Sequence, residues 1–158
     1  MSRDCTVFQE EDGTAYFISA SRDNADMHMY RLSEDYMNVD QLVNRLWQGE
    51  YREAPAVAKI NGRYYMLNSW CTGWAPNQGK YASADSMEGR WSRLENIGDE
   101  TTFGSQPAFI LQKDHQTLYF GDRWGGSGEK YFESGYVVYP LIEDHGKLTM
   151  QYQDEIEL

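Results

Sequence analysis

The chain has 158 residues, enough for one ordinary domain with a substantial hydrophobic core, and 15% of them are aromatic, which favours strands over helices. Its formal net charge of −11 speaks against binding to nucleic acids or to anionic membrane surfaces, which attract clustered Lys and Arg side chains. No apolar run approaches the roughly 20 residues that a membrane-spanning helix needs.

The first 51 residues predict three strands and a short helical segment. Strands at Thr6–Phe8 and Ala15–Ser19 flank a turn at Asp12-Gly13, and the alternating segment Met27–Leu32 is a third strand. Weak helical periodicity over Val39–Trp47 predicts one or two helical turns.

The next segment contains the strongest hairpin signal of the chain, Asn61-Gly62 within 59–64, because Asn-Gly suits a type I′ turn. A further strand is expected at Gly79–Ala84, followed by the segment Ser86–Trp91, and 99–104 is expected to be a loop.

The last segment has a hairpin turn at Asp114-His115 and a loop over Gly125–Glu129. Strands are expected at Ser134–Leu141 and Leu148–Tyr152.

The sequence gives no sign of a disulfide framework, a metal site or a cofactor. Cys5 and Cys71 form no Cys-x-x-Cys motif, so we expect two free thiols. The three histidines, His28, His115 and His145, share no metal-ligand spacing. The first residues lack the basic and apolar regions of a signal peptide, and the sequence leaves the location of the protein unknown.

Three strand–turn–strand stretches of the chain echo one another. Asp4 and Glu53 lie 49 positions apart in equivalent places, and Glu53 and Gln106 lie 53 apart. A period near 50 built from hairpins is typical of the blades of a β-propeller. The three stretches cover residues 3–17, 52–66 and 105–120.

We therefore predict a single all-β domain over residues 1–158, made of three propeller blades at 1–51, 52–104 and 105–158. Propellers usually have 4–8 blades, because the ring must close to protect its edges. Since three repeats fill the chain, we expect it to be part of a larger propeller.

The first strand of every blade lines the central channel, so Asp4, Glu53 and Gln106 are expected to converge on one solvent-accessible cleft. The residues alone leave alternatives open. Glu53 could pair with Arg52, Asp4 with Arg3, and Gln106 could bond to a loop backbone.

Five motifs, in this order, resemble glycoside hydrolase family 43, above all its branch of exo-β-1,3-galactanases and neighbouring arabinofuranosidases. The resemblance runs from Ser2 to Leu158 and implies a five-bladed propeller with its active site in the central funnel. The chain matches the last three blades, and the first two are absent from it. Family members are typically secreted or periplasmic. The motifs are Ser2-Arg3-Asp4-x-Thr6-Val7-Phe8, Arg52-Glu53-Ala54-Pro55-Ala56, Cys71-Thr72-Gly73-Trp74-Ala75-Pro76-Asn77, Ser105-Gln106 and Asp122-Arg123-Trp124.

The resemblance implies that Glu53 is the general acid, that Asp4 sets the pKa and orientation of this acid, and that Gln106 faces the site of water attack. A nearby second carboxylate raises the pKa of an acid and keeps it protonated near neutrality. Family members invert configuration, which requires about 6.5–9.5 Å between the two groups. The usual family base is an aspartate of the first blade, which this chain does not contain.

The same resemblance suggests five substrate-binding candidates. Asn24 and Thr72 fall in segments that contact sugar hydroxyls. Trp74 and Trp124 either stack on a sugar face or pack at the edge of the core. Arg123 braces the channel floor or pairs with an acid.

The leading hypothesis is an inverting, exo-acting hydrolase of plant galactan or arabinogalactan side chains, or its acid-bearing part. The alternatives are a non-catalytic carbohydrate-binding or interaction module, and a fragment completed by a partner chain or by self-association. Exposed blade edges invite pairing with another chain, so we expect an isolated monomer to be inactive or nearly so.

Overall fold

The computed structural model describes residues 2–156 and contains three four-stranded antiparallel sheets, in which each strand pairs with the next along the chain. The first sheet consists of β1 (Ser2–Gln9), β2 (Ala15–Ser21), β3 (Asp26–Leu32) and β4 (Val39–Leu46). The second consists of β5 (Arg52–Ile60), β6 (Arg63–Trp70), β7 (Lys80–Ala84) and β8 (Glu95–Asn96). The third consists of β9 (Gln106–Lys113), β10 (Gln116–Arg123), β11 (Gly135–Asp144) and β12 (Lys147–Met150), with a 3-10 helix, η1 (Gly128–Glu133), between β10 and β11.

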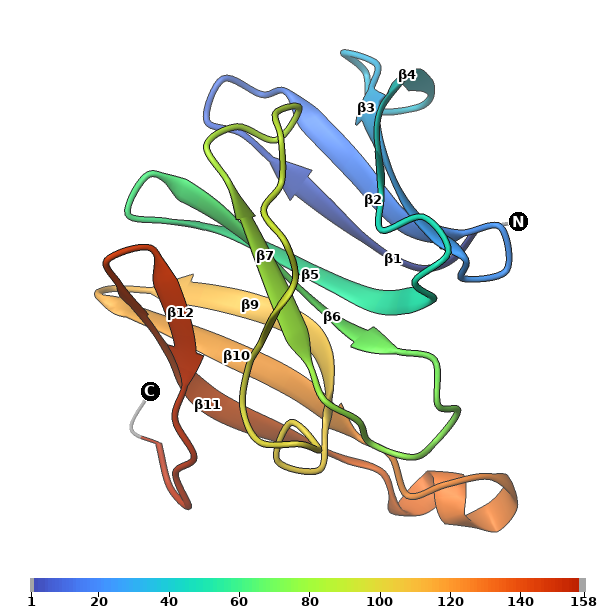
Figure 1. Cartoon of the computed structure of the whole chain (residues 1–158), viewed down its shortest axis with the longest axis vertical. Coiled ribbons are helices and arrows are strands. Elements are labelled where there is room, and N and C mark those ends of the chain that lie inside the picture. The colour runs from blue at the N-terminus through green and yellow to red at the C-terminus, as the bar shows by residue number, and fades with distance from the viewer. Residues whose placement is uncertain (1, 157–158) are drawn as a thin grey trace.

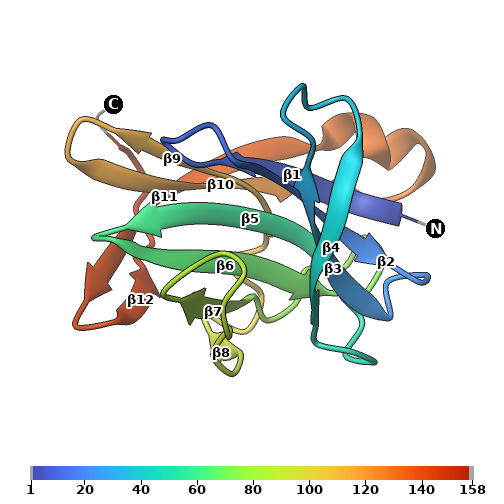
Figure 2. The same cartoon turned by 90° about the horizontal axis from the view of Figure 1, so that it is seen from above.

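The all-β prediction is confirmed, and the sheets are arranged as three blades of a partial propeller. Figures 1 and 2 show the second sheet between the other two, with β5 next to both β1 and β9. The predicted turns at Asp12-Gly13, Asn61-Gly62 and Asp114-His115 all connect paired strands. Asn61 and Gly62 have φ angles of 50° and 81°, and two positive values in succession identify the type I′ turn.

The prediction of helical turns over Val39–Trp47 is wrong, because this segment forms strand β4. The β3–β4 pairing has two register irregularities, so the strict alternation of side chains is interrupted. Val43 and Leu46 consequently both pack against the core although they are three positions apart. The irregular strand thus produces the spacing that resembles a helix. The predicted loop Gly125–Glu129 also differs in part, since η1 begins at Gly128.

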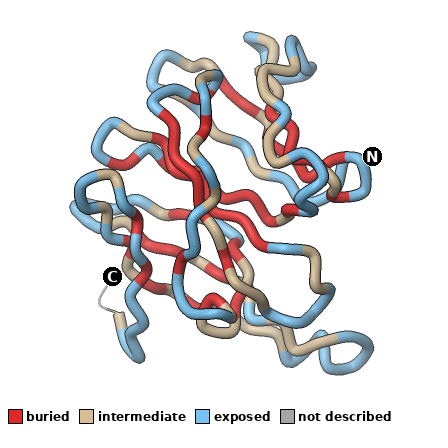
Figure 3. The backbone as a smooth tube through the Cα atoms, in the orientation of Figure 1, coloured by how far each residue is buried: buried red, intermediate tan, exposed pale blue. Residues whose placement is uncertain are grey.

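Two hydrophobic cores hold the three sheets together. The first interface lies between the first and second sheets, and the second interface lies between the second and third sheets. Alternation along β6 divides its side chains between them, because Tyr64 and Met66 face the first interface while Tyr65 and Leu67 face the second. Figure 3 shows that the buried residues are concentrated in the middle of the molecule.

The outward faces of the first and third sheets are much less covered. Val7 on β1 is 58% exposed, and Phe109 on β9 and Tyr136 on β11 are 52% and 80% exposed. We call these two surfaces the open faces. Within residues 2–156 no helix is both long and apolar enough to cross a membrane.

Candidate active site

A pocket of about 710 Å³ lies at the ends of the three inner strands β1, β5 and β9. Asp4, Glu53 and Gln106 all line it, so the structure brings together the three side chains that the repeats predicted to converge. Other polar and aromatic side chains of the lining are Arg3, Cys5, Asn24, Cys71, Trp74, Asp122, Trp124 and Tyr131.

Each inner strand carries one extra residue at this end, which forms a β-bulge. In β1 the two residues Arg3 and Asp4 lie between the pairs Ser2–Ser21 and Cys5–Ser19. In β9 the register shifts at Ala108, between the pairs that Pro107 and Phe109 make with β10. Bulges bend a strand and re-aim its side chains, and they are frequent next to active sites.

The bulge in β5 follows Glu53 directly. Ala54 and Pro55 lie between the pairs Glu53–Ser69 and Ala56–Leu67. Ala54 is buried and has a φ of 53°, a left-handed conformation that costs a non-glycine residue on the order of 1–3 kcal/mol. The surrounding structure thus holds the backbone beside Glu53 in a strained conformation.

Both carboxylate oxygens of Glu53 accept hydrogen bonds from other elements. Asn24 Nδ2 donates to Glu53 Oε2 at 2.9 Å, and Gln106 Nε2 donates to Oε1 at 3.1 Å. Burial raises the pKa of Glu53, and the negative charge of Asp4 raises it further, against the opposing hydrogen bonds from Cys71 and Gln106 and the positive charge of Arg3. The pKa of Glu53 therefore lies above its ordinary value, as the sequence predicted.

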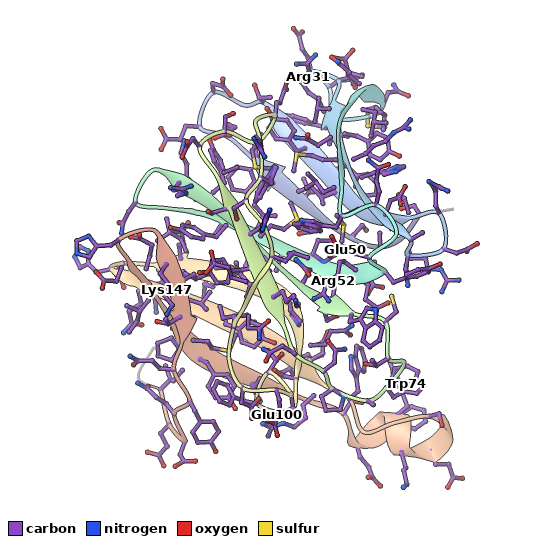
Figure 4. All side chains as sticks on the ribbon, in the orientation of Figure 1. Arg31, Glu50, Arg52, Trp74, Glu100 and Lys147 are labelled. Carbon is purple, nitrogen blue, oxygen red and sulfur yellow. The ribbon has the colours of Figure 1, made fainter. Side chains whose placement is uncertain are left out.

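The alternative partners of the two carboxylates bind other residues, although Arg3 lines the same pocket. Arg52 is buried on the other side of β5, where it donates to Asn68 Oδ1 at 2.6 Å and to the Asn68 carbonyl at 3.3 Å (Figure 4). Burial lowers the pKa of Arg52 to about 10. Arg3 forms its ion pair with Asp23, at 3.3 Å. In the part of the chain that the structure describes, neither Asp4 nor Glu53 has a cationic partner within 4.0 Å.

Three side chains fix the amide of Gln106. Its Nε2 donates to Glu53 Oε1 and, at 2.9 Å, to Ser69 Oγ, while its Oε1 accepts from Trp124 Nε1 at 2.8 Å. Because an indole N–H can only donate, Oε1 must face Trp124 and the amino group must face Glu53. Gln106 therefore bonds to side chains of the pocket rather than to a loop backbone.

The five substrate-binding candidates separate into two groups. Asn24 is buried beside Glu53, and its Oδ1 has no hydrogen-bond partner within residues 2–156. Trp74 and Trp124 line the pocket, with ring centroids 5.3 Å apart. Thr72 does not line it, because its hydroxyl donates to the Ala75 carbonyl within the loop.

Arg123 also lies away from the pocket lining. It is exposed, and its Nη2 donates to the Phe103 carbonyl at 3.1 Å and to the Tyr139 hydroxyl at 3.4 Å. Arg123 therefore braces a loop, and within residues 2–156 it forms no ion pair with an acid.

Three pocket residues were not assigned a role from the sequence. Asp122 pairs with Gln106 across β9 and β10, and burial and the charge of Asp4 raise its pKa. Counting residue pairs outward from the Asp114-His115 turn predicts a partner for Asp122 that is one residue away from Gln106. Burial and the charge of Glu53 raise the pKa of Cys71 to about 11, so this residue is a neutral thiol.

The third residue, Tyr131, comes from η1, and no signal in the sequence indicated that the loop would form a helix at the pocket. Among residues 2–156 no group of three His, Cys, Asp or Glu side chains is placed to hold a metal ion.

Comparisons with known proteins identify the family. The sequence model of glycosyl hydrolases family 43 matches residues 1–130. The structure superimposes on an exo-β-1,3-galactanase from Clostridium thermocellum with a TM-score of 0.90 and 47% identity, over 96% of this chain and 34% of that chain. It also superimposes on an exo-β-1,3-galactanase from Phanerochaete chrysosporium, solved with β-1,3-galactotriose, with a TM-score of 0.89 and 36% identity over 97% and 36% of the two chains.

A xylan 1,3-β-xylosidase from Vibrio is 29% identical over 101 residues, which are 61% of this chain and 18% of that protein. The chain thus spans about a third or less of the length of these relatives. It belongs to glycosyl hydrolases family 43, and its fold is a three-blade part of the propeller of this family.

Proposed function

We propose that this member of family 43 is the acid-bearing part of an inverting, exo-acting hydrolase of galactan-type polysaccharides, with Glu53 as the general acid. One observation supports this above all: Glu53 is half-buried, shares a pocket with a second carboxylate, Asp4, and has a raised pKa. The similarity to exo-β-1,3-galactanases supports a galactan-type substrate.

In this proposal each side chain around the acid has a definite task. The raised pKa keeps a larger share of Glu53 protonated near neutrality, ready to protonate the glycosidic oxygen of the leaving sugar. Asn24 holds Oε2 and thereby orients the carboxyl group. Asp4 raises the pKa of Glu53 through its charge and is exposed enough to contact a sugar hydroxyl.

The water side of the reaction is assigned to Gln106. Inversion needs about 6.5–9.5 Å between the acid and the group opposite to it, whereas Gln106 Nε2 lies 3.1 Å from Glu53 Oε1. An entering sugar would therefore replace this hydrogen bond. Trp124 and Ser69 can still anchor the amide, which would then orient the attacking water or relay its proton as a transient imidic tautomer.

A second candidate function is carbohydrate binding without catalysis. In this case the chain hydrolyses the bound sugar only after a partner encloses the pocket. The exposed position of Asp4 on β1 favours it, because this side of the pocket lies next to an open face. Solvent on that side weakens the electrostatic interactions on which catalysis depends. We therefore expect a monomer to be inactive or nearly so, and an assembly with itself or with a partner chain to be active.

The test compares Glu53→Gln with Glu11→Gln, a control at an exposed hairpin tip. Hydrolysis of a β-1,3-galactobioside, which has a poor leaving group, is measured across a wide range of protein concentration. Loss of a general acid lowers the rate by about 10²–10⁴-fold, while the control should retain wild-type activity. Undiminished hydrolysis by Glu53→Gln would exclude the acid role, and robust turnover by a strict monomer would exclude the need for assembly.

A further inference from the structure

Four aromatic side chains form a continuous cluster at one edge of the pocket. Trp74 lies 5.3 Å from Trp124 and 5.7 Å from Tyr131, measured between ring centroids. Trp124 and Tyr131 are stacked at 5.8 Å, and Tyr131 lies 5.9 Å from Phe132. We call Trp74, Trp124, Tyr131 and Phe132 the aromatic rim.

The rim is exposed to an extent that folding does not explain. Trp74 and Tyr131 are 46% and 44% exposed, and Phe132 is 87% exposed. Both Tyr131 and Phe132 belong to η1, which contains no buried residue. Large aromatic groups that cluster on a surface without serving the core commonly mark a binding site.

Local contacts hold η1 in place instead of the core. Ser134 Oγ donates to the Tyr131 carbonyl at 2.6 Å and accepts from the Gly125 N–H at 3.0 Å. A Cβ at Gly125 would collide with the Lys130 carbonyl oxygen, so only glycine permits this close approach. These contacts fix η1 against the segment that follows β10. The side chains of Tyr131 and Phe132 remain outside the hydrophobic cores.

The rim begins at the proposed catalytic groups and leads away from them. Trp124 is hydrogen-bonded to Gln106, and Trp74, Trp124 and Tyr131 all line the pocket, whereas Phe132 lies beyond the lining. Figure 4 shows Trp74 beside η1, at the edge of the fold. An exo-acting pocket holds only the terminal sugar, so the rest of a polysaccharide has to leave across an edge of the pocket.

The chemistry of the rim suits a neutral sugar chain. The ring C–H groups of galactose form an apolar face that packs on aromatic rings, while its hydroxyls remain in water. The charged residues next to the rim on η1 are Glu129, Lys130 and Glu133, which carry both signs and give no strong field for an ionic ligand.

We propose that the aromatic rim binds the sugar residues of a β-linked galactan that follow the one in the pocket. Tyr131 and Phe132 are then specificity-determining residues that favour chains of three sugars over a single sugar. This inference rests on the proposed function, because it takes the pocket as the site of the terminal sugar.

The test measures binding of galactose and of β-1,3-galactotriose by NMR titration. The proteins are the wild type, the double variant Tyr131→Ala/Phe132→Ala, and the control Tyr136→Ala, which removes a ring of 80% exposure outside the pocket lining. We expect the wild type and the control to bind the trisaccharide at least tenfold more tightly than galactose. The double variant should lose this preference and retain its affinity for galactose.

The possible outcomes distinguish a failure of the rim inference from a failure of the proposed function. If the wild type binds both sugars equally, or if the double variant keeps the preference, the rim inference is wrong while the proposed function stands. If the folded wild type binds neither sugar, the pocket is not a sugar site and both proposals fail. A double variant that loses only self-association, with sugar binding unchanged, would identify the rim as a protein contact and overturn the inference.

Discussion

The middle sheet and the two flanking sheets differ in how much of each is covered. The middle sheet has a core on both faces, and Tyr65 and Leu67 are fully buried within it. Each flanking sheet has a core on one face, and Val7 and Phe109 on the open faces are more than half exposed. The same strand–turn–strand unit is therefore buried on both faces in the middle sheet and on one face in each flanking sheet.

The contrast extends to the proposed catalytic groups. Glu53 lies on a strand of the middle sheet, is half-buried and accepts hydrogen bonds from Asn24 and Gln106. Asp4 lies on a flanking strand, is exposed and makes no side-chain hydrogen bond within residues 2–156. Burial is the main cause of the raised pKa of Glu53, so the acid owes its properties to having a sheet on either side.

The largest expected effect concerns stability. Leu67→Ala should lower the free energy of unfolding by about 2–5 kcal/mol, because it leaves a cavity in a closed core. Phe109→Ala removes a larger side chain from an open face and should cost no more than about 1 kcal/mol. Urea unfolding of both variants measures the difference, and equal costs would show that the open face is covered in solution.

The second prediction concerns what covers the open faces. We expect the apparent mass from light scattering to rise with protein concentration, because exposed apolar faces and strand edges promote association. Val7→Lys and Phe109→Lys should each weaken this association at least tenfold, or about 1.4 kcal/mol. Asn96→Lys, at an exposed position on the outer strand β8 of the middle sheet, should have no effect. A wild type that stays monomeric at all concentrations would contradict the prediction.

The sequence predicted the flanking and middle sheets equally well where local chemistry decides the structure. Asn61-Gly62 favours the type I′ turn that the structure contains, and most predicted strands are present. The error at Val39–Trp47 arose because register irregularities in β4 give a spacing that alternation alone does not predict.

The sequence predicted which strands carry the site residues, but it did not predict the hydrogen bonds between them. Repeat positions indicated that Asp4, Glu53 and Gln106 would meet, and they do. The one-residue bulges depend on tertiary packing. Counting residue pairs outward from the Asp114-His115 turn therefore places Asp122 opposite the neighbour of Gln106, one residue away from its observed partner. Tyr131 enters the pocket from a helix whose position depends on contacts of Gly125, and no periodic pattern reports these.

A third, smaller effect is the pH dependence of stability at Glu53. Its folded-state pKa lies above the ordinary value of 4.5, so the folded chain binds more protons than the unfolded chain between these two values. The free energy of unfolding should therefore fall as pH rises through this window. Glu53→Gln lacks the titrating group, so its stability relative to the wild type should be greater at pH 7 than at pH 4. If the difference in stability between the variant and the wild type is the same at both pH values, the charge of Glu53 does not destabilise the folded state.

The smallest expected effect isolates the contribution of Asp4. Asp4→Asn removes a negative charge but leaves the burial of Glu53, so the pKa of Glu53 should fall and still remain above its ordinary value. Titration of the Glu53 carboxyl carbon by NMR measures this, with Asp12→Asn at the distant hairpin tip as the control. Because Asp4 borders an open face, a partner that covers this face excludes water and strengthens the coupling between the two carboxylates. The fall should therefore be larger in associated protein than in monomer. A pKa of Glu53 that does not respond to Asp4→Asn in either state would remove Asp4 from the site and leave burial between the sheets as the whole cause.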